Sequence, residues 1–177
     1  MPEGADRAPM RLLAVTREVE RFVAGQGWDQ NPRLFALART ADLVALEPEI
    51  AEALGPDAAD SDSWTPIEQE LPAPATDIER LLATTGWPPE VAGAALVLER
   101  LMLPPGAEAS LGPESEAKDS AAAAHPDRQD VRIAVAVTRD GARMAAVRLR
   151  SHDDDGSVLF GEDLVSGLAE ALAATLR

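Results

Sequence analysis

Two histidines and a run of aspartates are the residues of this chain whose types could perform metal chemistry. His125 opens the segment from residue 125 to 155, and His152, Asp153 and Asp155 lie at its other end. Imidazole and carboxylate groups are suitable ligands for a divalent ion, and two histidines with one aspartate would suffice for an open site that activates water. One hypothesis is therefore a metal-dependent hydrolase or related enzyme that uses these four residues.

The spacing of these residues is weak evidence for a metal site. The sequence contains no HxH, HxxxH or HExxH motif, and nearby arginines would compete with a cation for the carboxylates. Ser151, His152 and Asp153 have the residue types of a hydrolase triad, but neighbours at a strand end point in different directions. For this cluster we favour a network of arginine and aspartate with partly exposed histidines.

Arginines gather in the same segment and suggest a second kind of site. Residues 127–150 contain six arginines and three aspartates, a local charge of +3 in a chain of net charge −15. Guanidinium groups bind carboxylates and phosphates through paired hydrogen bonds. The candidates for binding an anion or an acidic peptide are Arg128, Arg132, Arg143, Arg148 and Arg150.

Composition narrows the classes of partner and compartment. The chain has 177 residues and no cysteine, which excludes disulfides, thiolate ligands and thiol catalysis. Its charge of −15 disfavours nucleic acid and membrane surfaces, whereas another protein or a homo-oligomer stays compatible. Residues 1–10 lack the pattern of a signal peptide, and no window approaches 18 apolar residues, so we expect a cytoplasmic protein. We predict no cofactor.

Helical spacing of apolar residues predicts four helices in a single domain over residues 9–177, after a disordered N-terminus at 1–8. Thr40 is expected to cap the second helix, and Pro48 to restart or kink it. The helices cover residues 9–25, 40–55, 76–86 and a C-terminal stripe of Leu164, Val165, Leu168, Leu172 and Leu176.

Strands are predicted at residues 33–39, 64–71 and 92–103. The last of these also has apolar residues at helical spacing, but its flanking prolines and Gly93 favour a strand. Residues 104–124 are rich in Pro, Gly, Ala, Ser and Glu, which predicts a mobile loop.

The clearest hairpin covers residues 131–150, where one set of alternating positions is β-branched. A two-residue turn would bring arginines onto the valine face. A three-residue loop at 139–141 instead pairs Val131 with Leu149 and gives a nearly continuous apolar face. We therefore predict the longer loop, with Gly141 in the left-handed conformation of a bulge.

This register predicts the surroundings of the charged residues. Arg132, Arg148 and Arg150 fall on the face opposite the valines, with small residues between them, so the Ala-rich C-terminal helix is a candidate to cover that face. Residue 128 lies across from residue 152 at the open end of the hairpin, where the charged groups on both sides should converge.

The chain resembles a family of conserved hypothetical proteins from actinobacteria. The resemblance covers nearly everything after residue 10, and it implies a small cytoplasmic bacterial protein with an α+β fold. It implies no activity, cofactor or catalytic residue that could be assigned to a position. The runs that carry it are GWDQNPRLFALARTADL, WTPIEQELP, WPPEVAGAALVLERLMLPP, HPDRQDVRIAVAVTRDGARMAAVRLRSHDDD and DLVSGLAEALAATL.

The elements together predict an α+β fold, a mostly antiparallel sheet of four or five strands covered by three or four helices. Our leading hypothesis for function is a non-enzymatic interaction or accessory protein that presents the arginine-bearing face of the hairpin, and the metal-dependent enzyme is the alternative.

Overall fold

The structure is a computed structural model and describes residues 7–55, 62–72, 77–102 and 128–177. Its strands are β1 (Arg33–Arg39), β2 (Trp64–Gln69), β3 (Gly93–Met102), β4 (Gln129–Thr138), β5 (Arg143–Leu149) and β6 (Leu159–Gly161). Its α-helices are α1 (Arg7–Ala24), α2 (Thr40–Leu46), α3 (Ile50–Leu54), α4 (Ile78–Thr84) and α6 (Ser166–Ala174). Short 3-10 turns follow β5 at Arg150–His152 and Asp155–Ser157.

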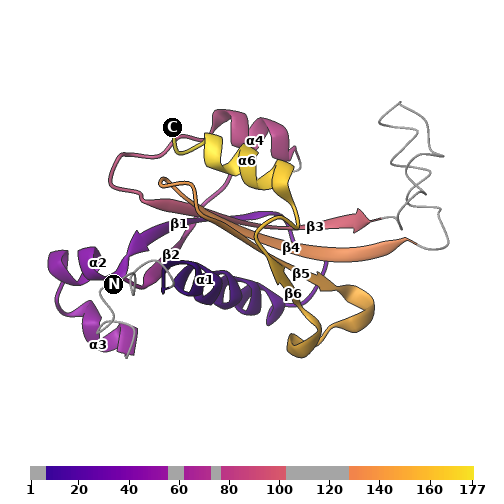
Figure 1. Cartoon of the computed structure of the whole chain (residues 1–177), viewed down its shortest axis with the longest axis horizontal. Helices are drawn as coiled ribbons and strands as arrows, with labels where there is room; N and C mark the ends of the chain where they lie inside the picture. Colours follow the sequence, from indigo (N-terminus) through magenta and orange to yellow (C-terminus); the bar gives the residue numbers. More distant parts are fainter. Residues whose placement is uncertain (1–6, 56–61, 73–76, 103–127) are drawn as a thin grey trace.

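One antiparallel sheet of six strands, in the order β2-β1-β3-β4-β5-β6, forms the centre of the fold (Figure 1). The α+β class and the antiparallel pairing are as predicted, with one more strand and one more helix than expected. β6 was missed because three residues are too few to show an alternating pattern. The additional helix arises because Pro48 divides the predicted second helix into α2 and α3.

Helices cover both faces of the sheet and create two apolar layers. α1 packs on one face through Leu12, Val15, Val19 and Val23, against small residues such as Ala134 and Ala146. α4 and α6 lie side by side on the opposite face, above the valines of β4 (Figure 1). The prediction that the C-terminal helix covers the arginine face was therefore wrong. The alternation of side chains along the strands assigned the residues to two faces correctly, but it could not show which amphipathic helix would cover each face.

The hairpin register is confirmed. Val131 pairs with Leu149, and the loop spans residues 139–141. The Gly141 amide donates to the carbonyl of Thr138 at 3.1 Å, and Gly141 has φ +95°, the left-handed conformation that the predicted bulge requires. The loop length therefore places every side chain of β4 and β5 on its predicted face.

Other local predictions are confirmed in part. β1 matches its predicted bounds, and residues 93–102 form a strand rather than the alternative helix. Thr40 is not a helix cap: it is the first residue of α2, and its hydroxyl contacts Ser63 and Thr65. α1 begins at Arg7, two residues before the predicted start, whereas residues 1–6 and the predicted mobile loop at 104–124 lie outside the described part.

No described helix is long and apolar enough to cross a membrane.

Candidate functional site

The predicted arginine site lies where α1 crosses β4 and β5, and its two central members are buried. Arg132 is 0% exposed and Arg148 is 3% exposed. α1 covers them because Glu20, on the sheet-facing side of that helix, supplies a buried carboxylate. The expectation that these two arginines form an open contact surface was therefore wrong. The sequence did not show this because Glu20 lies 128 residues away from Arg148.

Arg148 is the centre of a three-carboxylate network. Its Nε and Nη2 lie 2.5 and 3.1 Å from the two carboxylate oxygens of Glu20. Nη1 donates to Asp153 at 3.1 Å, and Nη2 donates to Asp155 at 2.6 Å. Trp28 Nε1 donates to the second oxygen of Asp153 at 2.9 Å. The network therefore fastens the segment after β5 to α1 and to the loop that follows α1.

Arg132 has a different environment from Arg148. Its guanidinium stacks 4.3 Å above the Trp28 ring, donates to the carbonyl of Gly27 and lies 3.7 Å from a Glu99 oxygen. Its Nε and Nη1 are buried without a hydrogen-bond partner in the structure. Glu99 accepts instead from the backbone amides of Asp29 and Gln30, both at 2.8 Å. Burial therefore lowers the pKa of Arg132, although the nearby carboxylates oppose that shift.

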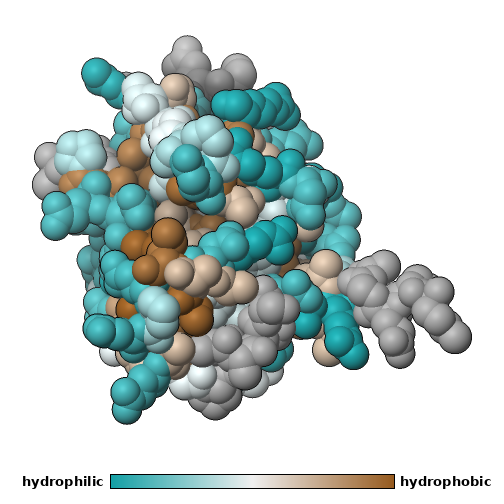
Figure 2. All heavy atoms as spheres, turned by 90° about the vertical axis from the view of Figure 1, so that its left-hand side faces the viewer, coloured by the Kyte–Doolittle hydropathy of each residue, from teal (hydrophilic) through white to brown (hydrophobic). Residues whose placement is uncertain are grey.

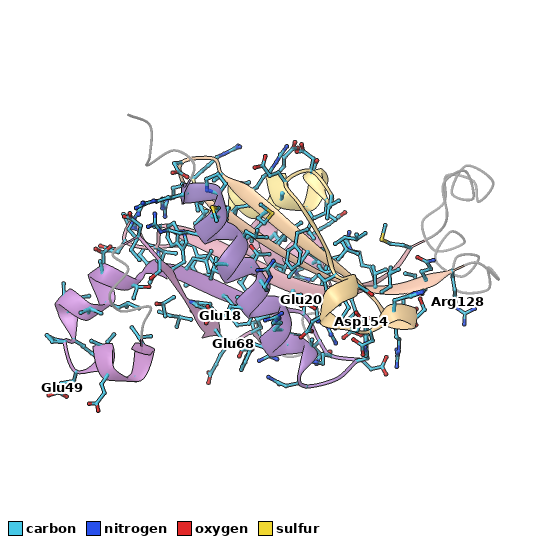
Figure 3. All side chains as sticks on the ribbon, turned by 60° about the horizontal axis from the view of Figure 1, so that its bottom comes forward. Glu18, Glu20, Glu49, Glu68, Arg128 and Asp154 are labelled. Atoms are coloured by element: carbon cyan, nitrogen blue, oxygen red, sulfur yellow. The ribbon has the colours of Figure 1, made fainter. Side chains whose placement is uncertain are left out.

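The other three predicted binding arginines occupy separate positions. Arg150 forms a two-point pair with Asp29, at 2.9 and 3.0 Å. Arg143, near the opposite end of the hairpin, pairs with Asp163. Arg128 is exposed, and its side chain forms no ion pair within the described ranges (Figure 3). The proposed set therefore does not form one arginine surface.

The residues of the metal hypothesis are only partly brought together. Asp153 and Asp155 both bind Arg148, while His152 is exposed and its Nδ1 contacts the Ser151 hydroxyl at 3.0 Å. His125 lies outside the described residues. Across the parts of the chain that the structure describes, no group of three or more His, Cys, Asp or Glu side chains is arranged to hold a metal ion.

Hydrogen bonds lower the pKa values of the aspartates that pair with Arg148 and Arg150. The Trp28 indole, followed by Arg148, lowers the pKa of Asp153, and Arg148 lowers the pKa of Asp155. Arg150 lowers the pKa of Asp29 in the same way, and Glu20 is the main cause of the raised pKa of Arg148. All of these shifts favour the charged forms. Asp29, Asp153, Asp155 and Arg148 are therefore held in ion pairs that favour their charged forms.

A different surface emerges from α2 and α3, which project from one end of the sheet (Figure 1). Leu46 is 80% exposed at the end of α2, and the other large apolar residues of α2 and α3 are only half-buried: Leu43, Val44, Ile50 and Leu54. Figure 2 views the molecule from this side and shows apolar residues gathered there among hydrophilic ones. We call residues 40–54 the α2–α3 lobe. Helical periodicity predicted its apolar stripe but could not show that no other described element would cover it.

The charges of the α2–α3 lobe all have one sign. Residues 40–54 contain Asp42, Glu47, Glu49 and Glu52, all exposed, and no lysine or arginine. Glu49 points away from the body of the molecule (Figure 3). The lobe therefore combines an apolar surface that the described part of the chain leaves exposed with an acidic border. Charged residues at the border of an interface select and steer a partner, whereas the apolar centre supplies most of the affinity.

Comparison with known families adds a decisive match. The model of the PPA1309-like protein family matches residues 12–177, which is almost the whole chain. The chain belongs to this family. Membership extends from α1 to the C-terminal residue and so includes both the ion-pair network and the α2–α3 lobe. Neither the search of the curated proteins nor that of the solved structures found a match.

Proposed function

We propose that the protein is a non-enzymatic interaction protein whose contact surface is the α2–α3 lobe. The observation that carries the proposal is the 80% exposure of Leu46 within a surface of half-buried apolar residues. Exposed apolar patches bordered by polar residues are typical of protein-binding sites. This surface takes the place of the arginine face, because Arg132 and Arg148 bind groups within the protein and lie beneath α1.

The charge of the lobe supports one class of partner over others. Its four exposed acids favour a partner segment that combines apolar residues with lysine or arginine, as in a basic amphipathic helix. A second copy of this chain fits less well. A symmetric contact through the lobe would bring the same acidic border into contact with itself, and like charges across an interface are unfavourable.

Model peptides provide a direct test. The probe is a helical peptide of leucine and lysine, and its control is the same peptide with glutamate in place of lysine. We expect Leu46→Glu to weaken binding of the lysine peptide at least about tenfold, because it places a charge at the apolar centre. The matched control is Leu159→Glu, which makes the same change at a leucine on β6 that is 59% exposed. Equal losses in the two variants, or equal binding of the two peptides, would contradict the proposal.

A further inference from the structure

A second apolar surface lies on the opposite side of the fold from α1, in the groove between α4 and α6. The groove has a volume of about 500 Å³, within the range of small-molecule sites. Ile78, Leu82 and Ala83 of α4 form one wall. Gly167, Ala171 and Ala174 of α6 contribute to the other, together with Leu168.

The groove is open on the α6 side because the side chains that α6 turns toward it are small. Gly167, Ala171 and Ala174 are four and three residues apart, so they lie along one side of the helix. A Cβ added at Gly167 would meet no atom within 4 Å. α4 and α6 therefore cover this side of the sheet without closing the space between them, and the space is lined mainly by aliphatic side chains.

Arg100 of β3 gives the groove a cationic group. Its exposed side chain forms no ion pair within the described ranges, although the chain has 31 acidic residues against 16 basic ones. Arg132, Arg143, Arg148 and Arg150, in contrast, all pair with carboxylates. Glu79 also lines the groove but forms no salt bridge with Arg100. A guanidinium that no described carboxylate pairs with, beside an aliphatic groove, favours an anionic head group with an apolar body.

We infer that this groove binds a small amphipathic monocarboxylate, with its alkyl chain between α4 and α6 and its carboxylate on Arg100. One anionic group is expected rather than two, because Glu79 would repel a second. Guanidinium and carboxylate form charge-assisted, two-point hydrogen bonds, and the alkyl chain covers apolar surface that is otherwise open to water. The site is separate from the α2–α3 lobe and does not depend on the function proposed for it.

Calorimetric titration with decanoate tests this inference. The wild-type protein should bind decanoate saturably, with one site per chain. Arg100→Gln should weaken binding about tenfold or more through loss of the charged hydrogen bonds. Arg128→Gln should leave binding unchanged, because Arg128 lies outside the groove and, like Arg100, forms no ion pair with the described residues. Ala171→Leu should abolish binding by filling the groove, and circular dichroism should show that this variant is folded.

Decyltrimethylammonium separates the charge requirement from general detergent binding. It carries a cation in place of the carboxylate on an alkyl chain that is one carbon longer than that of decanoate, and it should not bind at the same site. Absence of saturable decanoate binding to the wild type, equal binding of the cation, or unchanged decanoate binding in either Arg100→Gln or Ala171→Leu would overturn the inference. Leu46→Glu should bind decanoate like the wild type, so failure here is distinct from failure of the peptide experiment.

Discussion

Arg148 of β5 and Glu20 of α1 form a two-point ion pair that is almost completely removed from solvent, with N–O distances of 2.5 and 3.1 Å and exposures of 3% and 1%. Buried charges are costly to desolvate, and a pair of this kind is compensated only when its geometry is good and its remaining hydrogen bonds are made. Asp153 and Asp155 accept further hydrogen bonds from Arg148. The pair therefore fixes how α1 lies on the hairpin.

Arg148→Met should lower the free energy of unfolding by about 3–5 kcal/mol, because it leaves the carboxylate of Glu20 buried without its partner. Urea denaturation followed by circular dichroism measures the change. The double variant Glu20→Leu with Arg148→Met removes both charges and should recover most of the loss. If the double variant is as unstable as the sum of the two single changes, the two residues are not energetically coupled.

Arg132→Met should be far less harmful than Arg148→Met, within about 1 kcal/mol of the wild-type stability. Arg132 loses the stacking on Trp28, but the change also removes two buried donors that lack partners, and Glu99 retains its backbone amides. The same urea denaturation compares the two variants. An equal or larger loss for Arg132→Met would show that the Trp28 and Gly27 contacts outweigh the burial cost.

Acid should weaken the ion pairs of Asp29, Asp153 and Asp155 only at a pH below the ordinary pKa of an aspartate. The pKa values of Asp29, Asp153 and Asp155 are lowered in the fold. Their stabilisation is therefore complete above about pH 4, the pKa of an unfolded aspartate, and it is lost as the pH falls through the lower folded values. Thermal melts from neutral pH to about pH 2 should show Asp155→Asn with a smaller acid dependence than the wild type. Identical pH profiles would contradict this account.

Two glycines should respond differently to alanine. At Gly141 the added Cβ meets open space but the backbone has φ +95°, so Gly141→Ala should cost about 1 kcal/mol. At Gly93 the Cβ would lie 2.7 Å from the carbonyl oxygen of Val137, so β3 and β4 would have to move apart, at a cost of about 2–3 kcal/mol. Chemical denaturation of both variants checks the order, and the reverse order would be inconsistent with the close approach of the strands.

Local pattern was sufficient for much of the fold. Alternation and loop length predicted the pairing of Val131 with Leu149. The prolines that flank residues 92–103, together with Gly93, predicted the strand β3. Local sequence patterns could not predict which elements pack against each other in the tertiary structure. The burial of Arg148 depends on Glu20 in a distant helix, and the exposure of Leu46 depends on the absence of a covering element among the described residues. The candidate site therefore moved from the hairpin arginines to the α2–α3 lobe.

Site-specific crosslinking tests the interaction surface most directly. A photo-reactive amino acid is placed at Leu46 in one sample and at Leu159 in a second, and each is irradiated in an extract of the source cells. The account predicts a discrete crosslinked partner at position 46 but not at 159, with a segment rich in apolar and basic residues at the point of attachment. Excess wild-type protein should suppress that crosslink, and excess Leu46→Glu should not. The same partner at both positions, or attachment through an acidic segment, would contradict the central claim.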